Sequence, residues 1–340
     1  MLRFLPCSLL LVITSLLTSA CNTSDLKEAV NVADGVPRKT IDTDTLGMNA
    51  FANDARFGSP SSQFQEVSST LGLRFVRILV RWDSLVQPSK GSALNLSFAD
   101  TLLASIPADL DALIVMTGTP TWMSNPANWS AGDPRATFVE ELLSPVVARY
   151  GNHPRVIGFQ VWNEPNQDNT ENQILGLTNS AALYVDMLKR SSEVIRAQAP
   201  SKLVVGAATT AINQNYPTSL NYNRAMQDAG AQSHADIWAI HYYGRQFENV
   251  IRPGGIADFT GGLSLPIWIT ESGAQGVNQQ LAYGEQVWPF LREKIPTIQR
   301  IYVYQFTEAT PPDSTYGLKN LSADLPVSDL YVWLRDRANN

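Results

Sequence analysis

The sequence predicts an α/β fold in one domain, with eight strands closed into a barrel and helices around it. Three observations support this expectation. The chain has 340 residues, which is enough for one barrel of about 250 residues or more without a second domain. After about residue 45, short apolar segments alternate with amphipathic segments of helical spacing. Two of the apolar segments end on a glutamate, and barrels carry their chemistry at strand ends.

The expected strands are short apolar runs that cover, in chain order, residues 47–51, 73–82, 111–116, 156–161, 202–206, 236–240, 265–273 and 300–306. Helical spacing of apolar residues predicts the longer helices over residues 63–71, 133–150, 179–198, 277–295 and 329–337. Pro145 lies inside the helix over 133–150, where a proline should kink or break it.

Two of the expected strands lead to an acidic residue. The strand over 156–161 continues into Asn163 and Glu164, and Pro165 then stops it. The strand over 265–273 carries Glu271 near its end. A carboxylate in such a place is poorly positioned for core packing and well positioned for chemistry. An isolated Asn-Glu-Pro would suit an exposed loop, but a second glutamate in the same kind of position favours a catalytic pair.

The Trp-Asn-Glu-Pro run at 162–165 and the Trp-Ile-Thr-Glu-Ser-Gly run at 268–273 together resemble the retaining β-glycosidases of glycoside hydrolase clan A. These enzymes are TIM barrels in which the acid/base follows an asparagine at the end of the fourth strand and the nucleophile ends the seventh. The resemblance covers most of the chain after about residue 45. It implies a (β/α)8 catalytic domain over residues 45–340, with Glu164 as acid/base and Glu271 as nucleophile.

A retaining glycosidase needs two carboxylates about 5–5.5 Å apart. One must be ionised for attack, and the other must hold a proton near neutral pH, so the two need different surroundings. The resemblance implies that Asn163 binds the 2-hydroxyl of the sugar, a contact that strengthens in the transition state. No cofactor is needed. The three histidines of the chain are scattered, so no metal site is expected.

Arg77 lies among apolar residues in the strand over 73–82, and a buried charge needs a partner. The resemblance implies that Arg77 hydrogen-bonds the nucleophile and holds it ionised. Two alternatives stay open at this point. Arg77 could snorkel past the strand edge, or Arg81 could take its role.

The strand over 236–240 ends in His241, Tyr242 and Tyr243. A histidine in such a place is often a structural residue with satisfied partners. The clan pattern of histidine, any residue, tyrosine implies that His241 lies beside the catalytic pair and that the Tyr243 hydroxyl binds the nucleophile. Tyr242 would face the other side, because side chains alternate along a strand. His153 and His234 precede strands and are expected to be structural.

Aromatic residues near strand ends are candidates for sugar binding. Trp122 lies on the loop after the third strand, where barrels build their sites, and sugar C–H faces pack on indole rings. Ordinary loop packing is the alternative, and it is favoured for Trp129. Many clan members place a tryptophan on the last strand as the floor of the sugar site. This chain has Tyr304 and Phe306 there, so the floor residue stays open, with Tyr304 as the substrate-binding candidate.

The first 21 residues resemble a bacterial lipoprotein signal. Their apolar run over 9–17 is too short to span a bilayer comfortably, and Cys21 follows it. The resemblance implies that Cys21 is lipidated. The polar, mixed sequence over 22–44 indicates a flexible tether between membrane and enzyme. We therefore expect a lipid-anchored protein of the bacterial cell envelope, with Asn22 favouring the outer membrane. Ordinary secretion to the periplasm or the medium is the alternative.

Composition limits the other function classes. Charged residues make up 16% of the chain and the net charge is -6, which argues against a nucleic-acid surface. The two cysteines are Cys7 and Cys21, and Cys7 lies in the signal, so the mature domain has no disulfide pair and no cysteine nucleophile. We expect a monomer that binds a β-linked polysaccharide or oligosaccharide.

The substrate stays open at the level of sequence. The Thr-Pro-Thr-Trp segment at 119–122 and the Trp-Asn-Glu-Pro-Asn run at 162–166 look similar to families 39 and 5, whose members include xylosidases, endoglucanases, mannanases and exopolysaccharide hydrolases. Two non-catalytic alternatives remain, a glycan-binding lipoprotein and an envelope interaction protein that uses the barrel as a scaffold. Both glutamates and their expected supporting residues favour the enzyme, because function depends on the site and not on the fold.

Overall fold

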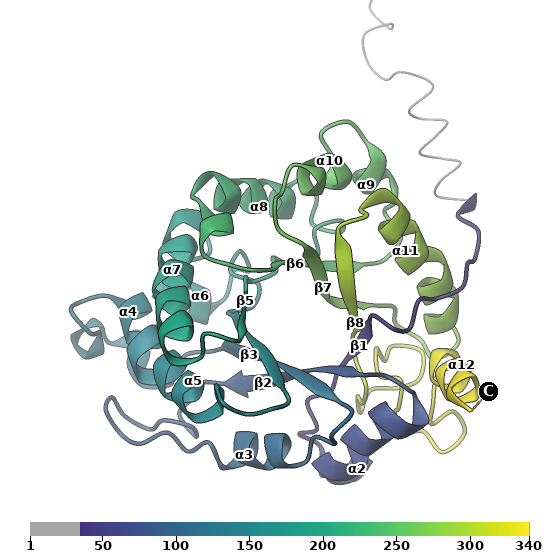
Figure 1. Cartoon of the computed structure of the whole chain (residues 1–340), viewed down its shortest axis with the longest axis horizontal. Helices are drawn as coiled ribbons and strands as arrows, with labels where there is room; N and C mark the ends of the chain where they lie inside the picture. Colours follow the sequence, from purple (N-terminus) through teal and green to yellow (C-terminus); the bar gives the residue numbers. More distant parts are fainter. Residues whose placement is uncertain (1–34, 340) are drawn as a thin grey trace, which may run out of the picture.

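The computed structural model describes residues 35–339, and these form one barrel of parallel strands with helices around it (Figure 1). The strands pair in the order β5-β4-β3-β2-β1-β8-β7-β6, and all seven pairings are parallel. A single parallel bridge between Val205 and Ile237 joins the β5 and β6 sides of the ring. The predicted single-domain (β/α)8 TIM barrel is therefore confirmed.

The eight strands lie close to the eight predicted runs. They are β1 Leu46–Asn49, β2 Phe75–Arg81, β3 Asp111–Thr117, β4 Val156–Val161, β5 Leu203–Val205, β6 Trp238–Tyr243, β7 Ile267–Gly273 and β8 Ile298–Val303.

Two strand ends differ from the prediction. β6 continues through Tyr243 because Tyr242 and Tyr243 still pair with Ser272 and Gly273 of β7, so His241 lies on the strand itself. β8 ends at Val303, so Tyr304 and Phe306 lie in the segment that follows it.

Helices follow most strands and pack on the outside of the ring (Figure 1). The α-helices are α2 Pro60–Gln65, α3 Ser97–Ala104, α4 Pro134–Phe138, α5 Ser144–Tyr150, α6 Thr170–Leu175, α7 Ala181–Gln198, α8 Thr218–Asp228, α9 Glu248–Ile251, α10 Ile256–Gly261, α11 Gln280–Lys294 and α12 Asp329–Ala338.

The predicted helix over 133–150 is interrupted ahead of Pro145. It consists of α4, a π-helical turn Val139–Leu143 and α5. The backbone N–H of Ser144 bonds to the carbonyl of Val139, five residues back. Proline lacks a backbone N–H, and its ring clashes with the carbonyl four residues before it in a regular helix. A wider turn at this place keeps the helix continuous past Pro145.

The interior of the barrel is filled by side chains below the carboxyl ends of the strands. A buried cluster there consists of Leu113, Val205, Ala208, Ile237, Ala239, Trp268 and Tyr302. Strand register places Leu113 beside Arg77, and Val205 beside Gln160, so these polar residues share the inward face with the cluster. The polar residues thus lie beside a packed apolar cluster in the interior of the barrel.

The last part of the predicted 22–44 tether is packed against the barrel. The backbone N–H of Lys39 donates to the carbonyl of Glu285 in α11 at 2.9 Å. Ile41 is 3% exposed and belongs to the core. Residues 39–44 are therefore held in place by a hydrogen bond and by apolar burial, and any free tether ends before them.

The expected signal segment and Cys21 lie outside the described residues. Within residues 35–339, none of the helices combines the length and the apolar character that a membrane crossing requires.

Candidate active site

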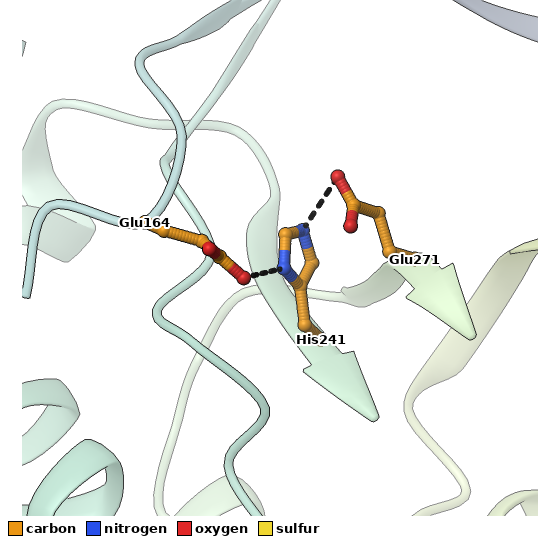
Figure 2. A group of neighbouring side chains, drawn as sticks. All are labelled: Glu164, His241 and Glu271. Atoms are coloured by element: carbon orange, nitrogen blue, oxygen red, sulfur yellow. Dashed lines mark hydrogen bonds and ion pairs between the residues drawn. The ribbon is translucent and has the colours of Figure 1, made fainter. Parts of the chain in front are cut away.

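Three titratable side chains meet at the carboxyl ends of the strands (Figure 2). Glu164 comes from the loop after β4, His241 from β6 and Glu271 from β7. Nδ1 of the imidazole is 2.9 Å from Glu164 Oε1, and Nε2 is 3.5 Å from Glu271 Oε1. One oxygen of each carboxylate and one imidazole nitrogen all lie within 4.8 Å of one another. The two glutamates that end separate strands in the sequence are therefore neighbours in space.

Glu271 is the more buried carboxylate, with 8% of its surface exposed. Its Oε1 accepts a hydrogen bond from Arg77 Nη1 at 2.7 Å, and its Oε2 accepts one from the Tyr243 hydroxyl at 2.9 Å. Burial alone would raise the pKa of this carboxyl. The charges of His241 and Arg77 and the two hydrogen bonds together outweigh burial and lower the pKa below its ordinary value of 4.5. Glu271 is thus held in the ionised form that a nucleophile needs.

Arg77 connects the site to three strands. It is 1% exposed, and its guanidinium donates to Gln160 Oε1 at 2.8 Å, to Asn49 Oδ1 at 2.8 Å and to Asn163 Oδ1 at 2.7 Å, besides its bond to Glu271. A buried charge with four acceptors is fully compensated. The alternative that Arg77 snorkels past the strand edge is therefore wrong.

Arg81 does not replace Arg77, because its side chain is 49% exposed and pairs with Glu171. Asn49 and Gln160 are site residues that the sequence analysis missed. Both are fully buried polar residues on strands, and each presents an oxygen to the guanidinium. Polar side chains in otherwise apolar strands were the available signal, because such groups are buried only with partners.

Glu164 lies in a loop of unusual backbone conformation. Trp162 has a φ of 74° and Glu164 a φ of 47°, which is the left-handed region that non-glycine residues seldom adopt. The Glu164 N–H donates to the carbonyl of Ala208 at 2.8 Å. Asn172 accepts from the Trp162 indole at 2.7 Å and donates to the carbonyls of Glu164 and Gln167, both at 2.8 Å. These bonds hold a strained loop in place, as is common at functional sites.

His241 lies between the two carboxylates with its side chain fully buried. Its Nδ1 lies within hydrogen-bonding distance of Glu164, while its Nε2 faces Glu271 without a hydrogen bond. The ring can therefore exchange a proton with Glu164 and adds positive charge near Glu271 when it is protonated. His153 and His234 precede β4 and β6 at the amino ends of the strands, away from this group, as expected for structural residues.

Three tyrosines line the site beside Glu271. Tyr243, Tyr304 and Tyr316 are in mutual edge-to-face contact, with ring centroids 5.5–5.9 Å apart. Burial raises the pKa of Tyr243 well above 10, and so does the nearby charge of Glu271, so the hydroxyl stays a donor. Phe306 is fully buried, whereas Tyr304 is partly exposed, so Tyr304 is the one of these two rings that can contact a ligand. Tyr316 was missed in the sequence analysis, because it lies twelve positions beyond Tyr304 in an irregular segment.

Trp122 is not brought to this group. Its ring packs edge-on against Trp82 at 5.4 Å, and its indole N–H donates to the carbonyl of Gln87 at 2.9 Å. Among the described residues, no ring contact or hydrogen bond joins Trp122 to Glu164 or Glu271. The Trp129 indole bonds to the Met123 carbonyl at 2.8 Å, in agreement with loop packing.

A cavity of about 660 Å³ opens beside Glu164. Its walls come from the loops after β4 and β5, from the start of α8, from Tyr243 at the end of β6 and from Tyr316 in the segment after β8. Its size lies within the range of about 300–1,000 Å³ that is usual for small-molecule sites.

Glu164, His241 and Glu271 are close enough to hold a metal ion by distance alone. The two carboxylates, however, approach different nitrogens of the ring, Nδ1 and Nε2. A metal site needs its ligand atoms aimed at one point, because coordination geometry is directional. Glu271 is moreover already bonded to Arg77 and Tyr243. This arrangement suits proton transfer and charge stabilisation better than metal binding.

Comparison with solved structures agrees with the barrel fold. A family 39 glycoside hydrolase from Bacteroides cellulosilyticus WH2 is 17% identical with a TM-score of 0.60, over 89% of this chain and 65% of that one. A monomeric β-xylosidase from Caulobacter crescentus CB15 is 16% identical with a TM-score of 0.62, over 88% and 69%. An exo-β-1,4-mannosidase from an Opitutaceae bacterium is 15% identical with a TM-score of 0.58, over 90% and 61%. At these identities the likeness concerns the fold alone.

No curated protein matches the sequence. A family profile described as cellulase (glycosyl hydrolase family 5) matches residues 38–302. This match spans most of the chain, from the segment packed on α11 to β8, and includes Glu164, His241 and Glu271. The chain therefore belongs to glycosyl hydrolase family 5 and is an O-glycosyl hydrolase.

Proposed function

We propose that this protein is a retaining glycosidase that cleaves β-glycosidic bonds in a polysaccharide or oligosaccharide by double displacement. The observation that carries the proposal is the carboxylate pair, whose nearest oxygens lie within 4.8 Å with one imidazole beside both. Retaining enzymes hold their carboxyl groups about 5–5.5 Å apart, whereas inverting enzymes leave about 6.5–9.5 Å for a water molecule. The spacing therefore favours a covalent glycosyl-enzyme intermediate.

In the first step, Glu271 attacks the anomeric carbon while Glu164 donates a proton to the leaving oxygen. The ion pair with Arg77 and the hydrogen bond from Tyr243 keep Glu271 anionic. Glu164 is less buried than Glu271, and its hydrogen bond to His241 orients its carboxyl group. The two carboxyls thus have the different surroundings that their different roles require.

Asn163 is placed to bind the sugar during this step. Its Oδ1 accepts from Arg77 Nη2 at 2.7 Å, which leaves its Nδ2 free to donate to a ligand. A donor at this position can bind the 2-hydroxyl of the sugar, and that contact strengthens as positive charge develops on the ring. Tyr304 offers a ring face for the apolar side of the same sugar.

In the second step, Glu164 acts as a base. Loss of its proton to the leaving group makes it a carboxylate, which can then take a proton from water as the water attacks the anomeric carbon. The bond between the anomeric carbon and the carboxylate oxygen of Glu271 breaks, and Glu271 returns to its ionised state. The atoms balance as one water consumed and one glycosidic bond cleaved.

We also propose the cellular setting that the sequence suggests. The protein acts as a monomer, anchored in the cell envelope through lipidated Cys21, on a β-linked glycan outside the cytoplasm. The cellulase name of the family profile and the xylosidase and mannosidase among similar structures support a neutral β-linked substrate.

A substrate screen tests the proposal. The wild-type protein and its Glu164→Ala variant are incubated with β-linked polysaccharides and aryl β-glycosides, and products are identified by mass. Oligomers released from one polymer by the wild type alone would establish an endo-acting hydrolase, and activity on aryl glycosides alone would indicate an exo enzyme. The retaining mechanism is tested with activated 2-fluoro glycosides, which should add one glycosyl group to the peptide that contains Glu271. Labelling elsewhere, or an inverted first product by NMR, would contradict it.

A further inference from the structure

Most of the residues that line the cavity beside Glu164 have no part in the proposed mechanism. Its walls include Gln167 and Asp168 from the loop after β4, and Gln214, Asn215 and Tyr216 from the segment between β5 and α8. These side chains lie at the carboxyl end of the barrel, where substrates enter. The cavity therefore extends the site from Glu164 toward the loops after β4 and β5.

That direction is the side of the leaving group. Glu164 lines the cavity and Tyr243 and Tyr316 border it, while Glu271, Arg77 and Asn163 are not part of its walls. In the proposed first step Glu164 protonates the glycosidic oxygen, so the departing sugar must lie on its side of the scissile bond. The sugar that forms the covalent intermediate lies on the side of Glu271 and Asn163. A sugar in the cavity is therefore the one that leaves.

The charged residues that line the cavity are all acidic. Among the described residues that line it, Glu164 and Asp168 are acidic, and none is lysine or arginine. When Glu164 carries the proton for catalysis, Asp168 is the one formal charge left on the walls. Arg252 stacks on the ring of Tyr216 at 5.1 Å and is not part of the lining.

Asp168 has a free oxygen for a ligand. Its Oδ1 accepts from Gln173 Nε2 at 2.7 Å, and no cation of the described residues forms an ion pair with it. An anionic sugar in the cavity would meet this carboxylate without compensation, whereas a protonated amine would pair with it. Like charges repel and opposite charges attract over such distances even near solvent, although more weakly than in the interior.

The amides of Gln214 and Asn215, in the segment after β5, suit sugar hydroxyls. Gln214 makes no hydrogen bond to any described residue, and Asn215 uses only its Nδ2, which donates to the Ala211 carbonyl at 3.3 Å. Asn166, by contrast, is fully engaged with Thr210 and Ser219 on both ends of its amide. Gln214 and Asn215 therefore keep donors and acceptors for a ligand, while Asn166 holds the walls together.

We propose that this cavity binds the leaving sugar and that Asp168 makes it select a neutral or amine-bearing sugar over a uronic acid. The proposal rests on the assignment of Glu164 as the acid, and it adds a charge preference that this assignment does not contain. The substrate class is then a glycan whose unit on the leaving side carries no carboxylate.

The test measures binding, so it does not depend on turnover. The full chain is titrated, with NMR detection, with methyl β-glucoside, methyl β-glucosaminide and methyl β-glucuronide at mildly acidic pH, where the amine is protonated and the uronate is ionised. In the wild type, the glucosaminide should bind at least as tightly as the glucoside, and the glucuronide should bind least. Asp168→Asn keeps the shape and removes the charge, and it should improve the ratio of glucuronide to glucosaminide affinity by about two- to fivefold.

Two further variants make the result specific. Gln214→Lys adds a cation to the lining of the cavity and should shift the preference further toward the glucuronide. Asp109→Asn changes the net charge equally, but Asp109 is exposed just before β3, at the amino end of the barrel, so it should change no ratio. Identical ratios in the wild type and Asp168→Asn, or no binding of any probe, would overturn the inference.

The inference and the proposed function can fail separately. Hydrolysis of a polymer by a protein whose Asp168→Asn variant shows unchanged ratios would leave the glycosidase intact and remove the charge preference. A charge preference in a protein that hydrolyses nothing would retain the binding site and remove the assigned chemistry.

Discussion

The hydroxyl of Tyr243, at the end of β6, donates a hydrogen bond to Oε2 of Glu271 on β7 at 2.9 Å. Arg77 occupies the other oxygen of this carboxylate, so Glu271 receives one neutral and one charged donor. Both donors favour the carboxylate over the carboxylic acid, and the pKa of Glu271 lies below 4.5 although burial opposes this. Glu271 is therefore already held in its ionised form in the protein without substrate, as the proposed role of nucleophile requires.

Removing this hydroxyl should shift the pH profile of the enzyme. Tyr243→Phe takes away a bond that favours ionised Glu271, so the pKa of Glu271 should rise and the acid limb of kcat/KM should move to higher pH. A hydrogen bond to a charged group contributes about 1.5–3 kcal/mol, which corresponds to a loss of roughly 10- to 100-fold in kcat/KM at the optimum. Tyr242→Phe is the matched control, because the Tyr242 hydroxyl is buried without a partner. An unshifted acid limb in Tyr243→Phe would contradict the assignment.

The lowered pKa of Glu271 also makes the free energy of unfolding depend on pH. A carboxyl whose pKa is lower in the folded than in the unfolded protein stabilises the fold at pH values above its ordinary 4.5, and this contribution is lost as the pH falls through the folded-state pKa. We expect Glu271→Gln to lose less stability than the wild type when the pH is lowered through this window. Denaturant unfolding at a series of pH values measures the difference, and parallel curves for the two proteins would argue against it.

Glu271→Gln should abolish turnover while the protein remains folded, because an amide cannot attack the anomeric carbon. Circular dichroism should match the wild type, since the glutamine fills the same space and still accepts from Arg77. Glu193→Gln, on the exposed face of α7, is the control for a charge change away from the site. An active Glu271→Gln enzyme would refute the proposed nucleophile.

Glu164→Ala should separate the two steps. Without the acid, substrates with poor leaving groups should react far more slowly, while aryl glycosides with very acidic leaving groups should still form the intermediate. Azide can then enter the space of the missing carboxylate and attack the intermediate, because it needs no general base. Recovery of rate by azide, with a β-glycosyl azide as product by NMR, is the expected result. An α-glycosyl azide, or no recovery with a substrate that shows a burst, would count against Glu164.

Asn172 should support both stability and activity without touching the substrate. Asn172→Ala leaves the buried Trp162 indole without its acceptor and releases the carbonyls of Glu164 and Gln167. Leaving a buried donor unpaired should cost about 1–3 kcal/mol in the free energy of unfolding, measured by urea denaturation. The rate with poor leaving groups should fall more than the rate with good ones, because Glu164 is misplaced. Asn339→Ala, at the exposed end of the chain, should change neither quantity.

The proposed lipid anchor is tested in cells. Cys21→Ser should move the protein from the membrane fraction to the soluble fraction, and metabolic labelling with a fatty acid should be lost. Cys7→Ser removes the other cysteine and should leave both results unchanged. Labelling that persists in Cys21→Ser would exclude this anchor and favour ordinary secretion.

The barrel and the two glutamates could be predicted from the sequence because both correspond to local sequence patterns. The spacing of apolar residues predicts the alternation of strands and helices. Glu164 and Glu271 each lie at or just after the end of an apolar run that is predicted to be a strand. The limits of prediction appear at the strand ends. β6 extends to Tyr243 through pairing with β7. Trp162 and Glu164 adopt a left-handed backbone conformation that the sequence of β4 does not predict.

The sequence by itself thus determined the class of fold, the acidic pair and, through a resemblance, the residues expected around it. Only the tertiary structure decided which partners those residues have. It surrounded Arg77 with Asn49, Gln160 and Asn163, placed Tyr316 beside Tyr304, left Trp122 in loop packing and opened the cavity lined by Asp168. The physical reason is distance along the chain. Arg77 and Glu271 are 194 positions apart, and they meet because the ring of strands closes, which no local pattern records.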